Sequence, residues 1–204
     1  QLGLNVDKYD QDLGNEKLAK YASMYGLNEK SGIEIEESEP QISDALSVVS
    51  AIGQGTNNFT TVGLARYVTT VANSGTCYDL TLLDKVTDTS GNLLVNYSAN
   101  VRNTIDMPQS YWNAIHQGMR GVVQNKKYYQ DFGVEVAGKT GTAEEDKSRP
   151  NHGLFVGYAP YDNPEVSMAI RIATGYSSDY ACQLSKQLMT VYFDLDENGA
   201  LTDS

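Results

Sequence analysis

Apolar residues recur three and four positions apart in four stretches of this chain, which is the spacing of an amphipathic helix. The first stretch is followed by Gly26, a residue suited to a helix C-cap, and the second ends at Ser74-Gly75. Pro108 opens the third stretch. The pattern therefore predicts four helices, over residues 15–25, 60–73, 108–123 and 178–193.

Two of these helices have a clear apolar set. The expected buried face of the third helix consists of Trp112, Ile115, Met119, Val122 and Val123. The last helix is amphipathic and carries Leu184, Leu188, Val191 and Tyr192. His116 is expected on the polar side of its helix, without a chemical role.

The second half of the chain contains runs typical of strands. Residues 132–142, 153–159 and 166–174 predict three strands joined by short loops. Before them, residues 80–86 and 93–97 flank Ser90-Gly91-Asn92 and predict a hairpin. Helices that precede a run of strands are typical of an α+β fold with an antiparallel sheet.

Composition narrows the class of protein. The chain has 204 residues, with 15 Lys and Arg against 26 Asp and Glu, a net charge of −11. So acidic a chain lacks the basic surface of a nucleic-acid binder, and no uncharged stretch is apolar enough to span a membrane. Cys77 and Cys182 match no metal motif, and we expect two free thiols rather than a bridge.

The most informative motif is Lys139-Thr140-Gly141-Thr142, which lies within a predicted strand and follows Gly138. Glycines inside a strand often mark a place where a ligand or another backbone comes close. An ammonium, a hydroxyl and an accessible backbone N–H suit a peptide that ends in a carboxylate and pairs with the strand edge. The motif therefore predicts a peptide-binding strand.

Several other motifs follow one another in a fixed order along nearly the whole chain. They are Tyr21-Ala22, Gly26, Ser31-Gly32-Ile33, Gly53-Gln54-Gly55, Ala72-Asn73-Ser74-Gly75, Gly118-Met119, Lys139-Thr140-Gly141 and His152-Gly153-Leu154-Phe155-Val156-Gly157-Tyr158-Ala159-Pro160. In this order they resemble the C-terminal half of the transpeptidase domain of class B penicillin-binding proteins, a family in which the Lys-Thr-Gly motif is shared with β-lactamases. The resemblance implies a β-lactamase-like antiparallel sheet flanked by helices, incomplete at its N-terminal side.

The resemblance also implies a function for the full-length protein. It would be a serine D,D-transpeptidase that cross-links peptidoglycan stem peptides at the extracytoplasmic face of the bacterial membrane, anchored by an upstream segment, and that binds β-lactams. The substrate-binding residues would be Lys139, Thr140, Gly141 and Thr142, of which Lys139 and Thr140 would bind the substrate carboxylate. Lys139 would also be catalytic, and the Thr142 backbone N–H would serve the oxyanion hole. Neither a metal nor an organic cofactor is implied. Partners would include other cell-wall synthesis proteins, and His152 would have a structural role.

One departure from the family is large. No serine in this sequence is followed three residues later by lysine, so the family's S-x-x-K nucleophile is absent. Ser98-Ala99-Asn100 fits the family's S-x-N pattern only literally, because it follows the glycine motif instead of preceding it. We therefore interpret residues 1–193 as a portion of the transpeptidase domain and residues 194–204 as an acidic tail.

As given, this chain is expected to be inactive and to associate with itself through surface that the missing half would cover. Two other functions stay open at this point. A penicillin-binding-like sensory or scaffolding module would have lost catalysis, and a β-lactamase would need its own upstream S-x-x-K. The residues encoded before Gln1 would distinguish the enzyme from the degenerate module.

Overall fold

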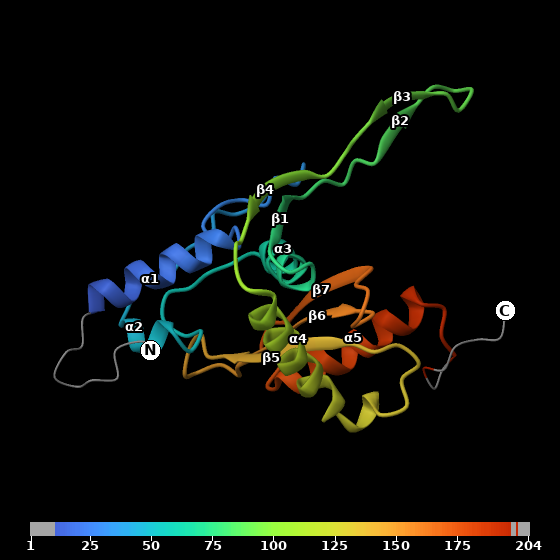
Figure 1. Ribbon diagram of the computed structural model, residues 1–204. Coiled ribbons are helices and arrows are strands. Elements are labelled where there is room, and N and C mark those ends of the chain that lie inside the picture. The colour runs from blue at the N-terminus through green and yellow to red at the C-terminus, as the bar shows by residue number, and fades with distance from the viewer. Residues whose placement is uncertain (1–10, 197–198, 200–204) are drawn as a thin grey trace.

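The computed structural model describes residues 11–196 and Gly199 (Figure 1). The helices are α1 (Gln11–Met24), α2 (Ser47–Ser50), α3 (Thr61–Ala72), α4 (Gln109–Gln124) and α5 (Ser178–Tyr192), with a 3₁₀ turn, η2, at Lys127–Tyr129. The strands are β1 (Thr76–Asp79), β2 (Lys85–Thr87), β3 (Leu93–Asn96), β4 (Asn100–Thr104), β5 (Ala137–Ala143), β6 (His152–Ala159) and β7 (Val166–Ile172). All four predicted helices are confirmed within a few residues at their ends.

A three-stranded antiparallel sheet forms the centre of the molecule, in the order β5-β6-β7 (Figure 1). Helix α3 packs on β6 and β7, and α4 packs against β5 on the same face, while α5 covers the other face. The three predicted strands are therefore confirmed. The first begins at Ala137 rather than at Phe132, because Phe132 and Val134 reach the core from the turns before it.

Two apolar clusters fill the space between the sheet and its helices. On one face, Val68 and Ala72 of α3 pack against Ala137 and Tyr158 of the sheet. On the other face, Phe155 packs with buried residues of α5 and of the segment before β5. Both cysteines are free and buried, as expected.

The buried stripe of α4 differs from the predicted one. Trp112 and Val123 are buried, but Ile115 is largely exposed. His116 does not lie on the polar side of its helix as expected, because its Nε2 lies 2.7 Å from the carbonyl oxygen of Val71 in α3. That it has no chemical role stays a prediction. Trp112, His116 and Val123 thus lie on the side of α4 that faces α3 and the sheet. His116 connects α4 to α3, and Ile115 lies at the edge of the buried face.

Helix α5 also buries a different face from the one its leucines indicate. Ala181, Cys182, Ser185 and Met189 are buried, whereas Leu184, Leu188, Val191 and Tyr192 are exposed. The sheet beneath contains glycines with little free space, and the backbone of Ser177 passes so close to Gly153 that a Cβ there would lie 2.4 Å from the Ser177 carbonyl oxygen. Small residues let the helix approach such a surface closely, so the large residues point outward.

The predicted hairpin is confirmed as the antiparallel pair β2 and β3, although its first strand covers Lys85–Thr87 and not residues 80–86, and it extends away from the body of the molecule (Figure 1). Its base is a second pair, β1 and β4, which sequence analysis missed. Strand β4 is Asn-Val-Arg-Asn-Thr, a polar run with one apolar residue, and it becomes a strand only by pairing with β1.

A partly buried polar contact joins the segment after α1 to the start of α3. The Glu37 carboxylate accepts hydrogen bonds from the Ser31 backbone N–H (2.7 Å), the Ser31 hydroxyl (2.8 Å) and the Thr60 hydroxyl (2.5 Å). Thr60 is also the N-cap of α3 and accepts from the Gly63 N–H. The acidic stretch that looks like a solvated loop in the sequence therefore holds two elements together.

Only part of the predicted acidic tail is described. Leu195 is buried and its N–H donates to the Thr190 carbonyl oxygen, while residues 197, 198 and 200–204 lie outside the described residues. The boundary at residue 194 stays a prediction. Within residues 11–196 and 199, no helix has both the length and the apolar character that a membrane crossing requires.

Candidate functional site

Strand β5 carries the Lys139–Thr142 motif and lies at one edge of the three-stranded sheet. On its inner side it pairs with β6 without a register break, and Thr140 stands opposite Phe155. On its outer side no strand of the described part of the chain pairs with it. The motif is therefore presented on an open edge, where an extended peptide could add as a further strand.

Side-chain alternation divides the motif between the two faces of the sheet. Thr140 pairs with Phe155, which packs toward α5, so Thr140 and Thr142 belong to that face. Lys139 and Gly141 belong to the face that α3 and α4 cover further along the sheet. The four predicted site residues are therefore consecutive at one edge, with Lys139 and Gly141 on one face of the sheet and Thr140 and Thr142 on the other.

Lys139 is exposed, and its Nζ donates a hydrogen bond to the Thr140 carbonyl oxygen at 2.7 Å. Among the described residues, no carboxylate forms an ion pair with this ammonium group. The charge is therefore held close to the strand by a neutral partner. Its attraction for an anion from outside the chain is not neutralised by the protein.

The two glycines around Lys139 have different surroundings. A Cβ on Gly138 would lie 2.3 Å from the Phe155 ring and 2.8 Å from the Val156 carbonyl oxygen. A Cβ on Gly141 would meet only the Leu154 Cβ, at 3.5 Å. The expectation that both glycines clear space for a ligand is therefore wrong for Gly138, whose missing side chain makes room for Phe155, and only Gly141 leaves its face open.

His152 lies at the start of β6, opposite Ala143 at the end of β5. It is 8% exposed, and its Nδ1 accepts a hydrogen bond from the Thr174 N–H at 3.0 Å. Its Nε2 lies 2.7 Å from the Glu145 carboxylate. The structural role expected for His152 agrees with these contacts, whereas Glu145 drew no attention in the sequence because an exposed glutamate in an acidic loop carries no pattern.

The literal Ser98-Ala99-Asn100 motif does not join this site. Asn100 begins β4, and its side-chain amide donates to the Asp79 carboxylate of β1. Both residues belong to the two-stranded ribbon and not to the central sheet. The interpretation of this motif as a coincidence therefore agrees with its place in the fold.

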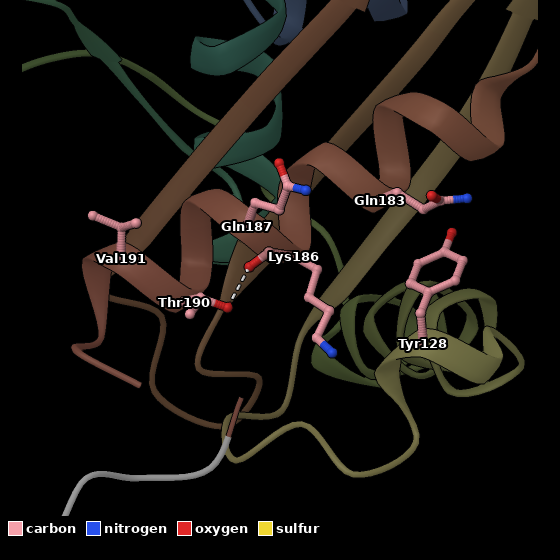
Figure 2. Close-up of a pocket in the computed structure, with 6 residues that line it drawn as sticks. All are labelled: Tyr128, Gln183, Lys186, Gln187, Thr190 and Val191. Atoms are coloured by element: carbon pink, nitrogen blue, oxygen red, sulfur yellow. Dashed lines mark hydrogen bonds between the residues drawn. The ribbon is translucent and has the colours of Figure 1, made fainter. Parts of the chain in front are cut away.

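A separate hollow of about 430 Å³ lies beside α5, between that helix and η2 (Figure 2). Tyr128 borders it on one side and Gln183 and Lys186 on the other. Burial, together with the nearby Cys182 and Asp179, raises the pKa of the Tyr128 hydroxyl, which therefore stays protonated. None of the predicted site residues lines this hollow, and it is not a candidate for the chemistry of β5.

Comparison with known proteins identifies the family of this chain. Residues 6–190 match the family described as "Penicillin binding protein transpeptidase domain". Penicillin-binding protein 2B of Streptococcus pneumoniae is 27% identical over 175 residues, which cover 76% of this chain and 26% of that protein. Its solved structure superposes with a TM-score of 0.72 at 25% identity, over 89% of this chain and 33% of that one.

Two further relatives agree with this result. Peptidoglycan D,D-transpeptidase MrdA of Haemophilus influenzae is 26% identical over 222 residues, covering 90% of this chain and 33% of that protein. Penicillin-binding protein A of Mycobacterium tuberculosis, in its imipenem acyl-enzyme complex, shares the fold with a TM-score of 0.67 at 23% identity, over 76% of this chain and 36% of that one. The present chain thus spans between a quarter and just over a third of the length of these relatives.

These likenesses confirm the α+β transpeptidase fold inferred from the sequence. They also account for the order of the motifs, since the family match runs through all the segments that carry them. The chain belongs to the penicillin-binding protein transpeptidase family.

Proposed function

We propose that this chain is the C-terminal part of the catalytic domain of a peptidoglycan D,D-transpeptidase that acts through a serine acyl-enzyme. The observation that carries the proposal is the exposed ammonium of Lys139 on the open edge of β5. The printed name of the relative from Haemophilus influenzae, a peptidoglycan D,D-transpeptidase, supports the same reaction. The full-length protein would act at the extracytoplasmic face of the membrane, without a cofactor.

In this proposal β5 forms one wall of the active site. A stem peptide lies along the free edge of β5, and its terminal carboxylate binds the ammonium of Lys139. Charge-assisted hydrogen bonds of this kind contribute about 1.5–3 kcal/mol. Gly141 leaves the same face of the strand free for the peptide. The Thr142 backbone N–H would donate to the oxygen that becomes negative when the carbonyl is attacked.

The nucleophile comes from residues upstream of this sequence. The serine Oγ attacks the carbonyl carbon of the penultimate D-alanine, the C–N bond to the terminal D-alanine breaks, and D-alanine leaves with the proton. The amine of a second stem peptide then attacks the ester and releases the serine. A β-lactam acylates the same serine, but its amine stays tethered after the ring opens and the ester persists. The imipenem acyl-enzyme of the mycobacterial relative supports this part.

The test is acylation of the full-length protein by a fluorescent penicillin. We expect a covalent label on a serine upstream of Gln1, and no mass increase by intact mass spectrometry when this chain alone is incubated with penicillin. Lys139→Ala should slow acylation at least about tenfold, because a bond to a charged group is lost. Lys139→Arg should lose less, since it keeps the charge.

Lys127→Ala is the matched control, because it removes an equally exposed lysine from η2 and not from the sheet. Thermal melting of each variant checks that folding is unchanged. Acylation of Lys139→Ala at the parental rate with an unchanged melt would show that β5 is not the active-site wall. A full-length protein that takes no label and carries no S-x-x-K would instead be a degenerate binding module.

A further inference from the structure

His152 connects three segments that are far apart in the sequence. It opens β6, its Nδ1 accepts from Thr174 in the turn after β7, and its Nε2 contacts Glu145 in the loop after β5. Because the Thr174 N–H can only donate, Nδ1 must accept and carries no proton in this arrangement. The ring proton therefore lies on Nε2 and is donated to the Glu145 carboxylate.

Arg171 is the third residue in contact with the His152 ring. A guanidinium nitrogen of Arg171, on β7, lies 3.2 Å from Nε2 of His152. Guanidinium groups donate and do not accept, so Arg171 cannot take the Nε2 proton, and the Glu145 carboxylate is the acceptor for it. Of the two groups in contact with Nε2, only the Glu145 carboxylate can accept, and Glu145 belongs to the loop between β5 and β6.

The turn after β7 is itself fixed against the start of β6. Its Tyr176 N–H donates to the Asn151 carbonyl oxygen at 3.0 Å, and the Ser177 backbone leaves no room for a side chain on Gly153. His152 is therefore held on a rigid support. Glu145, whose side chain is 60% exposed, is the partner that is free to move away.

We propose that His152 is a positioning residue that fastens the loop after β5 through Glu145 and thereby fixes the end of the Lys139–Thr142 strand for acylation. The inference rests on the proposed function. Glu145 follows Ala143 by two residues, and Ala143 follows Thr142 directly, so the bond acts on the backbone next to the motif. Neither His152 nor Glu145 contacts the substrate in this proposal.

The experiment combines amide hydrogen exchange with acylation of the full-length protein by a fluorescent penicillin. Glu145→Ala and His152→Asn should each speed exchange of amides 144–151, because both remove the bond to the loop. The asparagine amide oxygen of His152→Asn can still accept from Thr174. Loss of one hydrogen bond of this kind predicts a decrease in acylation efficiency of roughly twofold to tenfold.

Two variants provide the comparison. Glu145→Gln keeps an acceptor for the Nε2 proton and should restore both exchange and acylation to near the parental values. Glu144→Ala removes the same charge one residue earlier from a side chain that is exposed and makes no hydrogen bond to a described residue, and it should change neither. The double variant Glu145→Ala/His152→Asn should be no slower than either single one, because one bond is shared.

The outcomes separate this inference from the proposed function. If loop exchange in Glu145→Ala equals that in Glu144→Ala, the inference is wrong whatever the acylation rate. If exchange rises but acylation is the same in both, the loop is fastened without positioning the motif, and the inference is also wrong. A parental protein that takes no label would overturn the proposed function, and with it the catalytic consequence of the bond.

Discussion

The two glycines of β5, Gly138 and Gly141, have different roles. Gly138 is buried, and its missing Cβ makes room for the Phe155 ring and for the pairing of β5 with β6. Gly141 has only one ordinary contact at the position where a Cβ would stand. The same residue type therefore serves packing at one position and accessibility at the other.

This difference predicts opposite results for two alanine substitutions. Gly138→Ala should lower the free energy of unfolding by about 1–3 kcal/mol, because the new methyl group would overpack the site against Phe155. Gly141→Ala should leave the thermal melt nearly unchanged but slow acylation by a fluorescent penicillin. Chemical denaturation and labelling of both variants check this pair, and an equal loss of stability in both would show that the two glycines are equivalent.

At the scale of elements, Glu37 joins the segment after α1 to the N-terminus of α3. Burial by itself would raise the pKa of the Glu37 carboxyl, but the hydrogen bonds from Thr60 and Ser31, together with the nearby Arg66 guanidinium, outweigh it and lower the pKa. A folded-state pKa below the unfolded value means that the ionised carboxylate stabilises the fold.

The sign of this shift defines a pH window. The contribution of Glu37 is fully present above the ordinary glutamate pKa of about 4.3 and is lost as the pH falls through the lower folded-state pKa. Glu37→Gln should therefore melt below the parental protein at pH 7, and the gap should narrow below about pH 4. Glu36→Gln, for which no hydrogen bond is seen, is the control. A gap that is constant from pH 7 to pH 3 would contradict the assignment.

At the scale of the whole molecule, several apolar surfaces are exposed among the described residues, and two of them form regular rows. Helix α5 exposes a row one helical turn apart, formed by Tyr180, Leu184, Leu188 and Val191. The β2–β3 ribbon exposes Val86, Leu93 and Val95 on one face, since Val86 pairs with Val95 and Leu93 lies two residues before it. Neighbouring exposed apolar side chains are typical of regions that another segment or partner covers.

The isolated chain should therefore bind a hydrophobic dye and associate with itself. We expect the α5 row to dominate, so Leu184→Gln/Leu188→Gln should shift the sedimentation profile toward the monomer and reduce dye fluorescence. Leu94→Gln, on the other face of the ribbon from Val95, is the matched control and should have little effect. A monodisperse monomer without dye binding would show that the chain closes its own core.

Much of the fold was predictable because its signals are local. Helical periodicity, Gly26 after α1 with its positive φ of 73° and Ser74-Gly75 after α3 depend on neighbouring residues only, and they predicted the helices closely. The pair β1–β4 was missed because β4 is polar and acquires its structure from a partner more than twenty residues away. The assignment of Lys139–Thr142 as site residues rests on the order of the motifs and not on their geometry, and it stays a prediction.

The sequence by itself determined the family, the helices, the strands of the central sheet and the position of Lys139, since each depends on residue type and spacing along the chain. Only the tertiary structure decided which face of α5 is buried, that Gly138 makes room for Phe155, and that Glu145 reaches His152. The physical reason is that burial and hydrogen bonding depend on what a side chain meets across space. Leu184 and Leu188 of α5 are equally apolar whichever face of the helix is buried. They point outward because the sheet lies too close to α5 for large side chains.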